Sequence, residues 1–270
     1  MYYGSYSELD SPLHRVTPSA KLLVGALVML SMTLVFDPVT PAMLIVLALV
    51  LLRGLGHVPF GTILRALWPA ALAALGFFWV GVAFPRPSEA VTVVAQLGPL
   101  SVTAEALWRA GAIGLRVLCF GVYSMLLVLT TDPTDLMLAL VQHCRVPAGI
   151  AYAAMAGYRF VPLFTSEAES IALAHRVRGL GLSGGLSGRV ESARRFAIPL
   201  LASAIRRAER VAIAMESKGF DGHSQRTYFH TLRWRASDVL FLVAMLATFG
   251  AIFALSHYFG FLRLWDGTTY

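Results

Sequence analysis

Five runs of apolar residues punctuate the chain. They cover Leu22 to Phe36, Ala42 to Leu52, Leu67 to Phe84, Ala110 to Thr130 and Val239 to Leu255. A helix that crosses a bilayer needs about 17–25 predominantly apolar residues, because all its backbone hydrogen bonds are made within the segment. The pattern predicts an all-α polytopic membrane protein with about five transmembrane helices.

The second and third runs have features that affect the helices they predict. Ala42 to Leu52 is too short to span alone, so it reaches a spanning length only by including part of the Asp37–Pro41 turn or by extending Arg53 toward the interface. In the third run, Pro69 is expected in the first helical turn, where proline is tolerated. Residues 85–109 are expected to be irregular and to end in a short amphipathic pattern.

The composition supports a membrane protein. The chain has 270 residues, of which 57% are hydrophobic and only 14% charged, and its mean hydropathy is +0.68. Soluble domains average about 25% charged residues. The lipid bilayer is therefore the expected surrounding of most of the chain.

The region from Thr131 to Ser237 carries most of the positive charge. It holds 14 Lys and Arg against 8 Asp and Glu, within a net charge of +7 for the whole chain. Basic segments of membrane proteins stay in the cytoplasm. We therefore predict an N-terminal membrane domain with four spans (1–130), a cytoplasmic domain (131–237) and a C-terminal span (238–270). The N-terminus is then cytoplasmic and the C-terminus outside.

Helical patterns fill the cytoplasmic region. Asp132 is a predicted helix cap, with Pro133 at the first helical position, and Pro147 begins a longer helix that ends at Gly179. The segment Gly181–Gly188 is rich in glycine and serine and predicts a hinge. A second basic helix follows. Its apolar stripe recurs at three- and four-residue spacing, at Leu200, Leu201, Ala204, Ala208, Val211, Ala212 and Met215.

Motifs for catalysis are missing from the sequence. Cys119 and Cys144 lie in unrelated contexts and indicate neither a disulfide framework nor a metal site. Leu182–Gly185 reads LSGG, as in cassette ATPases, but the chain has no GxxxxGK[ST] phosphate loop, so a flexible linker is the better interpretation. No HExxH, GxSxG or paired intramembrane carboxylates are found. We expect no cofactor and no enzymatic activity, and the missing basic-and-aromatic module argues against nucleic acid.

Arg116 is the one charged residue within the fourth apolar run. Such a residue is a functional candidate by default, because a charge in hydrocarbon is costly. Two structural explanations compete with a functional role. The guanidinium either extends to the outer interface or pairs within the bundle.

Two helices of the cytoplasmic region end in the same way. The first ends in Val177-Arg178-Gly179 and the second in Ser217-Lys218-Gly219. A basic residue in the last turn offsets the helix dipole, and a following glycine takes the left-handed position, so each end alone is explained as a cap. Two copies on consecutive helices favour a further role, in which the paired ends dock into equivalent sites on a dimeric partner.

The order of these motifs resembles the transmembrane T component of energy-coupling factor transporters. The resemblance runs through SPLHRVTPSAKLL, TTDPTDLMLAL and YRFVPLFTSEAESIALAHRVRGL, and continues through IPLLASAIRRAERVAIAMESKGFDG to the last span. The family serves uptake of vitamins and of transition metals such as cobalt or nickel. Its two short motifs, usually Ala-Arg-Gly or similar, lie at the ends of coupling helices that contact the ATPases.

The resemblance implies specific partners and site residues. They are two cytoplasmic cassette ATPases, forming a homo- or heterodimer, and an integral membrane S component that binds the substrate. The ATPase-docking residues are then Val177, Arg178 and Gly179 in the first motif, and Ser217, Lys218 and Gly219 in the second. Lys218 departs from the usual Arg, which keeps the charge but loses the planar bidentate fork. Two alternatives are a small membrane enzyme and a membrane anchor for another cytoplasmic complex.

The charge distribution generates a prediction about topology. Single cysteines introduced at Ser187 and Ser224 should be labelled only from the cytoplasmic side of the inner membrane, and one at Thr268 only from outside, because basic segments are retained inside. The measurement is labelling of intact and permeabilised cells with an impermeant maleimide. Labelling of Ser187→Cys from outside intact cells would rule out the five-span arrangement.

Overall fold

The computed structural model describes residues 11–84, 93–97, 100–179, 186–222 and 228–260. The chain divides into two compact units. The bundle unit comprises residues 4–136 and 232–270, and the helix-pair unit comprises residues 1–3 and 137–231.

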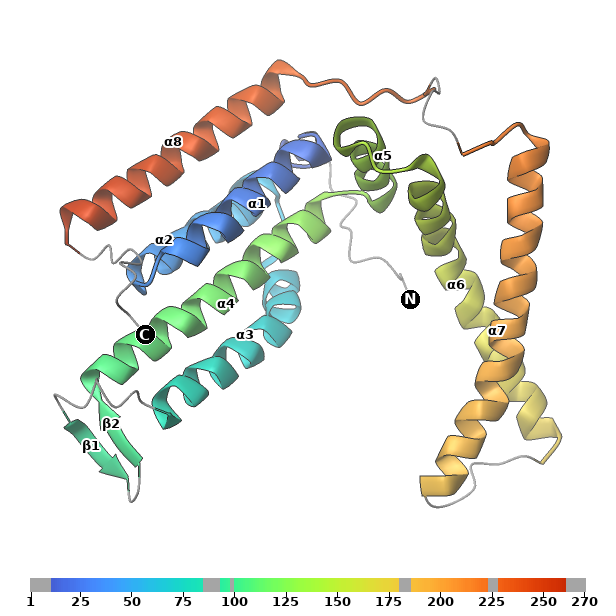
Figure 1. Ribbon diagram of the computed structural model, residues 1–270, viewed down its shortest axis with the longest axis horizontal. Coiled ribbons are helices and arrows are strands. Elements are labelled where there is room, and N and C mark those ends of the chain that lie inside the picture. The colour runs from blue at the N-terminus through green and yellow to red at the C-terminus, as the bar shows by residue number, and fades with distance from the viewer. Residues whose placement is uncertain (1–10, 85–92, 98–99, 180–185, 223–227, 261–270) are drawn as a thin grey trace. The chain divides into compact units, whose positions relative to one another are not determined.

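The bundle unit is built around one long helix. Its elements are α1 (Pro18–Leu34), α2 (Val39–Val50), the π-helical turn η1 (Leu51–Leu55), α3 (Phe60–Ala83), α4 (Ala104–Thr130) and α8 (Ala236–Tyr258). Helix α4 has α3 on one side and α1 and α2 on the other, and α8 packs against α1 and α2 (Figure 1). The core joins α1, α2, α4 and α8 through buried side chains such as Val28, Leu44, Val122 and Phe249.

The all-α polytopic prediction is confirmed, and the helix lengths refine it. Among the described residues, three helices are long and apolar enough to cross a bilayer: α3, α4 and α8. Two shorter apolar helices, Pro18–Leu34 and Val39–Leu55, lie at the lower end of the spanning range. The second helix includes Val39 to Pro41 of the predicted turn, and it continues through η1 past Arg53. It therefore gains length at both ends of its short apolar run.

The position of Pro69 differs from the sequence prediction. Helix α3 begins at Phe60, directly after the extended residue Pro59, so Pro69 lies in its interior. The apolar run begins only at Leu67, after the charged residue Arg65. The helix continues through it because helical hydrogen bonding does not require an apolar side chain at every position.

A short hairpin occupies part of the segment expected to be irregular. Strands β1 (Val93–Leu97) and β2 (Leu100–Thr103) pair antiparallel, with Leu97 opposite Leu100 and an irregularity between Val93 and Ala95. The hairpin leads directly into α4. The Thr103 hydroxyl accepts a hydrogen bond of 3.2 Å from the Ala106 N–H and so caps that helix.

The helix-pair unit consists mainly of α6 (Ala148–Val177) and α7 (Leu186–Ser217), which pack together and cross in Figure 1. Helix α5 (Pro133–Cys144) begins in the bundle unit and continues into this one. As predicted, Asp132 caps α5: its Oδ1 accepts from the Thr134 N–H at 2.7 Å. Of the predicted hinge Gly181–Gly188, residues 181–185, with the LSGG motif, lie outside the described residues, and residues 186–188 belong to α7.

Small residues allow α3 and α4 to approach closely. A Cβ added at Gly121 would lie 2.3 Å from the Ala70 Cβ, and one at Gly81 would lie 2.9 Å from the Ala110 Cβ. A Cβ at Gly114 would meet the Ala74 carbonyl oxygen at 3.2 Å. Close backbone approach at small residues is how membrane helices gain packing energy, because lipid supplies no hydrophobic force between them. The α3–α4 pair therefore depends on these glycines.

This packing predicts a large effect of one methyl group. Gly121→Ala should lower stability by about 1–3 kcal/mol, because the new Cβ forces α3 away from α4. The matched control is Gly111→Ala on the same helix, where an added Cβ meets nothing within 4 Å. The measurement is thermal unfolding of the purified protein in detergent. Equal melting temperatures for the two variants would contradict the close approach.

Candidate functional site

The two basic helix ends identified from the sequence share one backbone geometry. Helix α6 ends at Val177, Arg178 occupies the C-cap with φ −76°, and Gly179 follows with φ +70°. The Gly179 N–H donates to the Arg176 carbonyl oxygen at 3.1 Å. A left-handed residue after the cap reverses the chain and satisfies carbonyls that the helix leaves unpaired, and glycine adopts this conformation without a Cβ clash.

The end of α7 completes the same motif with one more bond. Gly219 has φ +79°, and its N–H donates to the Glu216 carbonyl oxygen at 2.9 Å. The Phe220 N–H donates to the Met215 carbonyl oxygen at 2.9 Å. These two bonds form a Schellman motif, so the backbone itself satisfies the last carbonyls of α7.

The side chains at both ends face outward. Val177 is 89% exposed, and Arg178, Ser217 and Lys218 are also exposed. Because backbone N–H groups already bond the Arg176 carbonyl of α6 and the Met215 and Glu216 carbonyls of α7, those carbonyls do not require either cation. The structure therefore presents one basic group beside a glycine turn at the end of each helix.

Contacts between α6 and α7 hold these ends on one scaffold. The Arg207 guanidinium on α7 lies over two rings of α6, 5.7 Å from the Phe160 centroid and 5.9 Å from that of Phe164. It also pairs with Glu167 of α6 at 3.6 Å. Near the end of α7, Phe220 meets Tyr152 of α6 edge-to-face at 5.6 Å. These contacts fix the orientation of α7 on α6.

Helix α7 also carries an apolar stripe that α6 does not cover. Ile198, Leu201 and Ile205 are each more than half exposed, and their spacing places them on one side of the helix. Of the stripe predicted from the sequence, Leu201 lies on this exposed side, whereas Leu200 and Val211 lie on the half-buried side. An exposed apolar surface of this kind marks an interaction site or a lipid contact.

Arg116 pairs within the bundle, which decides between the two structural alternatives. Its Nη2 donates to the Val35 carbonyl oxygen, at the C-terminal cap of α1. Its guanidinium lies 4.9 Å from the centroid of the Phe36 ring. The arginine therefore closes the end of α1.

A polar junction that the sequence analysis did not identify lies where α1, α4 and α8 meet. Lys21 directly precedes the first apolar run in the sequence, but its side chain is buried, and Nζ donates to the Thr130 carbonyl oxygen at 2.6 Å. Asp238 is fully buried, and its Oδ1 accepts from the Thr17 N–H at 2.9 Å. The sequence offered two signals for this junction. Lys21 and Asp238 each stand directly before an apolar run, and Asp238 follows Arg235 at the spacing of a helix-capping side chain.

A second buried polar cluster closes a different part of the bundle. The Asp37 Oδ2 accepts from the Thr40 N–H at 2.7 Å and from its hydroxyl at 2.8 Å. The Thr40 and Ser256 hydroxyls are 2.9 Å apart, which joins the start of α2 to the end of α8. Each of these side chains is buried.

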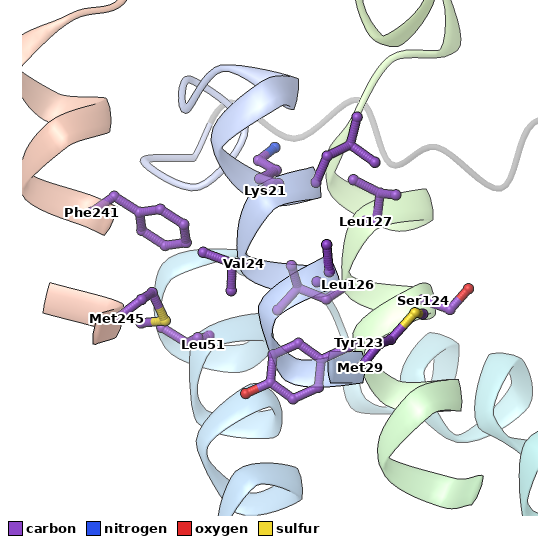
Figure 2. Close-up of a pocket in the computed structure, with 13 residues that line it drawn as sticks. Lys21, Val24, Met29, Leu51, Tyr123, Ser124, Leu126, Leu127, Phe241 and Met245 are labelled. Atoms are coloured by element: carbon purple, nitrogen blue, oxygen red, sulfur yellow. The ribbon is translucent and has the colours of Figure 1, made fainter. Parts of the chain in front are cut away.

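An apolar cavity of ≈ 210 Å³ lies between α1, α4 and α8 (Figure 2). Lys21 lies at one end of it and Tyr123 toward the other, and Phe241 and Met245 of α8 line one side. Gly25 and Ala26 contribute little side-chain volume on the α1 wall. Ala26 and Met29 are exposed, so the cavity opens to the surface of the bundle unit on this face of α1.

These sites consist of exposed cations at two helix ends and of buried polar side chains that hydrogen-bond between helices. Within the described part of the chain, no group of three or more His, Cys, Asp or Glu residues is placed to hold a metal ion. The helix ends offer exposed cations on a rigid helix pair, and the buried junctions fix helices to one another. Such features suit docking and the transmission of movement.

Known proteins are similar to this chain in sequence along most of their length. The model of the CbiQ family, described as cobalt transport protein, matches residues 10–229. The energy-coupling factor transporter transmembrane protein EcfT of Listeria innocua is 31% identical over 263 residues, covering 94% of this chain and 98% of its own. EcfT of Heliobacterium modesticaldum is 31% identical over 91% of this chain and 94% of its own. The Streptococcus thermophilus protein is 31% identical over 90% and 94%.

Proposed function

Because the chain belongs to the CbiQ family and is a transmembrane T component of an energy-coupling factor transporter, we propose that it links two cassette ATPases to an S component. The S component binds a vitamin or a transition-metal ion and determines the substrate. The T component itself catalyses no reaction, and the ATPases hydrolyse the ATP. The family resemblance seen in the sequence motifs is confirmed by these relatives.

The repeated helix end is the observation that carries the ATPase part of the proposal. Arg178 and Lys218 are both exposed beside a left-handed glycine, and at each end the glycine N–H already bonds a helix carbonyl. Two equivalent cations on one rigid helix pair fit two equivalent acidic grooves on an ATPase dimer. Exposed charges of this kind give specificity and fast association as well as affinity.

The uncovered apolar stripe of α7 supports the second part. Ile198, Leu201 and Ile205 are exposed on a helix whose other side packs against α6. An apolar face on the polar unit of a membrane protein is a natural docking surface for an apolar partner helix. We assign this stripe to the S component.

The resulting mechanism is mechanical. ATP binding draws the two ATPases together, and the ends of α6 and α7 follow because their cations are docked. The Arg207 contacts keep the two helices in register near Phe160 and Phe164. The movement then reaches the S component through the apolar face of the helix pair. We place the helix-pair unit and the N-terminus in the cytoplasm and the C-terminus outside.

Copurification tests the proposed assembly. The solubilised T component should retain two cassette ATPases and one small integral membrane protein, whereas an enzyme or an anchor of another complex would not.

In this complex, Arg178→Ala should sharply reduce ATP-dependent uptake while substrate binding to the isolated S component is unchanged. Losing a charge-assisted contact at an interface costs about 2–5 kcal/mol. Normal uptake of the copurifying protein's ligand by Arg178→Ala at native expression would reduce the arginine to a helix cap.

Substitutions of Lys218 separate docking from capping. If Lys218 faces an acidic groove, Lys218→Arg should retain ATPase association, Lys218→Gln should weaken it, and Lys218→Glu should abolish it with the subunit still folded. A charge–dipole interaction alone is worth only about 0.3–1 kcal/mol, so a capping role predicts small, graded losses of stability and near-normal assembly. Pull-down of the ATPases at matched subunit levels measures the difference. Full retention by Lys218→Glu would exclude the residue from the interface.

A further inference from the structure

Within the residues that the structure describes, the chain passes between the bundle unit and the helix-pair unit twice. It leaves the bundle unit after α4, through Thr131 and the first turn of α5, and it returns through residues 232–235 into α8. Any force that the helix-pair unit exerts through the backbone enters the bundle unit at the end of α4 or at the start of α8. The residues that hold these two points in place determine which helix of the bundle unit receives the force.

Lys21 fixes the outgoing connection to α1. Its Nζ donates to the Thr130 carbonyl oxygen at 2.6 Å and to the Thr131 hydroxyl at 3.3 Å. Lys21 is only 3% exposed, and Thr130 and Thr131 are also buried. A buried ammonium that loses its partners is costly, so this bond resists separation of α1 from the end of α4.

Asp238 fixes the returning connection to the same helix. Its Oδ2 accepts from the Arg235 N–H at 2.8 Å, within the first turn of α8, and its Oδ1 accepts from the N–H of Thr17, the N-cap of α1. The side chain is completely buried. One carboxylate thus holds the starts of two helices with charge-assisted bonds, which are stronger than neutral ones.

Both connections therefore converge on Thr17 to Lys21, the N-cap and first turn of α1. We propose that Lys21 and Asp238 are positioning residues that transmit movement of the helix-pair unit to α1. The cavity along α1 supports this role, because Gly25 and Ala26 leave space on that side of the helix, into which α1 can shift. This inference rests on the proposed function, and it adds that α1 is the membrane helix that responds.

The Asp37–Thr40–Ser256 cluster supplies an internal comparison. It is also buried and also joins two helices of the bundle unit. However, it lies at the α1–α2 turn and the end of α8, where the chain makes no connection to the helix-pair unit. Weakening this cluster should soften the bundle without interrupting the proposed transmission.

The experiment compares two reporters in the complete transporter complex. A spin label at Leu30→Cys reports α1, where the side chain is 71% exposed, and one at Ile213→Cys reports α7, where it is 65% exposed. Cys144→Ser removes the exposed native cysteine. The measurement is the change in label mobility when a non-hydrolysable ATP analogue is added to the complex in lipid vesicles.

The expected result is a selective loss at α1. In Lys21→Met and Asp238→Ala, the ATP-dependent change at Leu30→Cys should fall by roughly 2- to 30-fold, the range seen for residues that carry coupling. The change at Ile213→Cys should persist in both. Ser256→Ala removes one bond of the comparison cluster and should leave both changes intact, and Lys21→Arg should restore much of the signal because it keeps a donor for Thr130.

Several outcomes would overturn the inference. An undiminished change at Leu30→Cys in either variant would show that α1 does not depend on these bonds, and an equal loss in Ser256→Ala would show general loosening. If Lys21→Met and Asp238→Ala do not assemble, Asp238→Asn takes their place. Its amide can accept from only one of the Thr17 and Arg235 N–H groups, so an undiminished change at Leu30→Cys in this variant would overturn the inference. A wild-type complex with no ATP-dependent change at Ile213→Cys would instead contradict the proposed function itself.

Discussion

Every helix leaves backbone groups unpaired at its ends, and in this protein that requirement determines where the charged residues lie. Within a bilayer no water is available to satisfy these groups, and an unsatisfied one costs several kcal/mol. Arg116 closes the end of α1 through the Val35 carbonyl, and Lys21 closes the end of α4 through that of Thr130. Asp238 closes the starts of α1 and α8. The arrangement of the bundle unit depends on these few bonds.

The helix-pair unit meets the same requirement with glycine instead of charge. Left-handed Gly179 and Gly219 let the backbone satisfy its own carbonyls at the ends of α6 and α7. Arg178 and Lys218 are thereby left exposed at the surface. Lys21 and Arg116 in the bundle unit serve the fold, whereas the cations at these two helix ends are exposed and available to a partner. This contrast explains how residues of one chemical type have different roles in one chain.

Rigid and loose packing are also distributed unevenly within the bundle unit. The glycines between α3 and α4 bring those helices so close that an added Cβ would clash, whereas a cavity runs along α1. A helix with space beside it can move at lower cost than one in close contact. The α3–α4 pair is thus suited to act as a fixed frame and α1 as the part that responds.

The sequence by itself determined the helical membrane class, the approximate position of each span and the two basic helix ends, because hydrophobic periodicity, proline and glycine act locally. It did not determine that α3 begins at Phe60, which places Pro69 within a helix, or that β1 and β2 pair. Nor could it pair Lys21 with Thr130 or Asp238 with Thr17, residues separated by 109 and 221 positions. Those contacts depend on which helices pack together, and a single charge next to an apolar run is equally compatible with a membrane border. Only the tertiary structure brings Thr130 and Asp238 to the first turn of α1. The burial of a residue and its hydrogen-bond partner depend on how the helices of the bundle pack together.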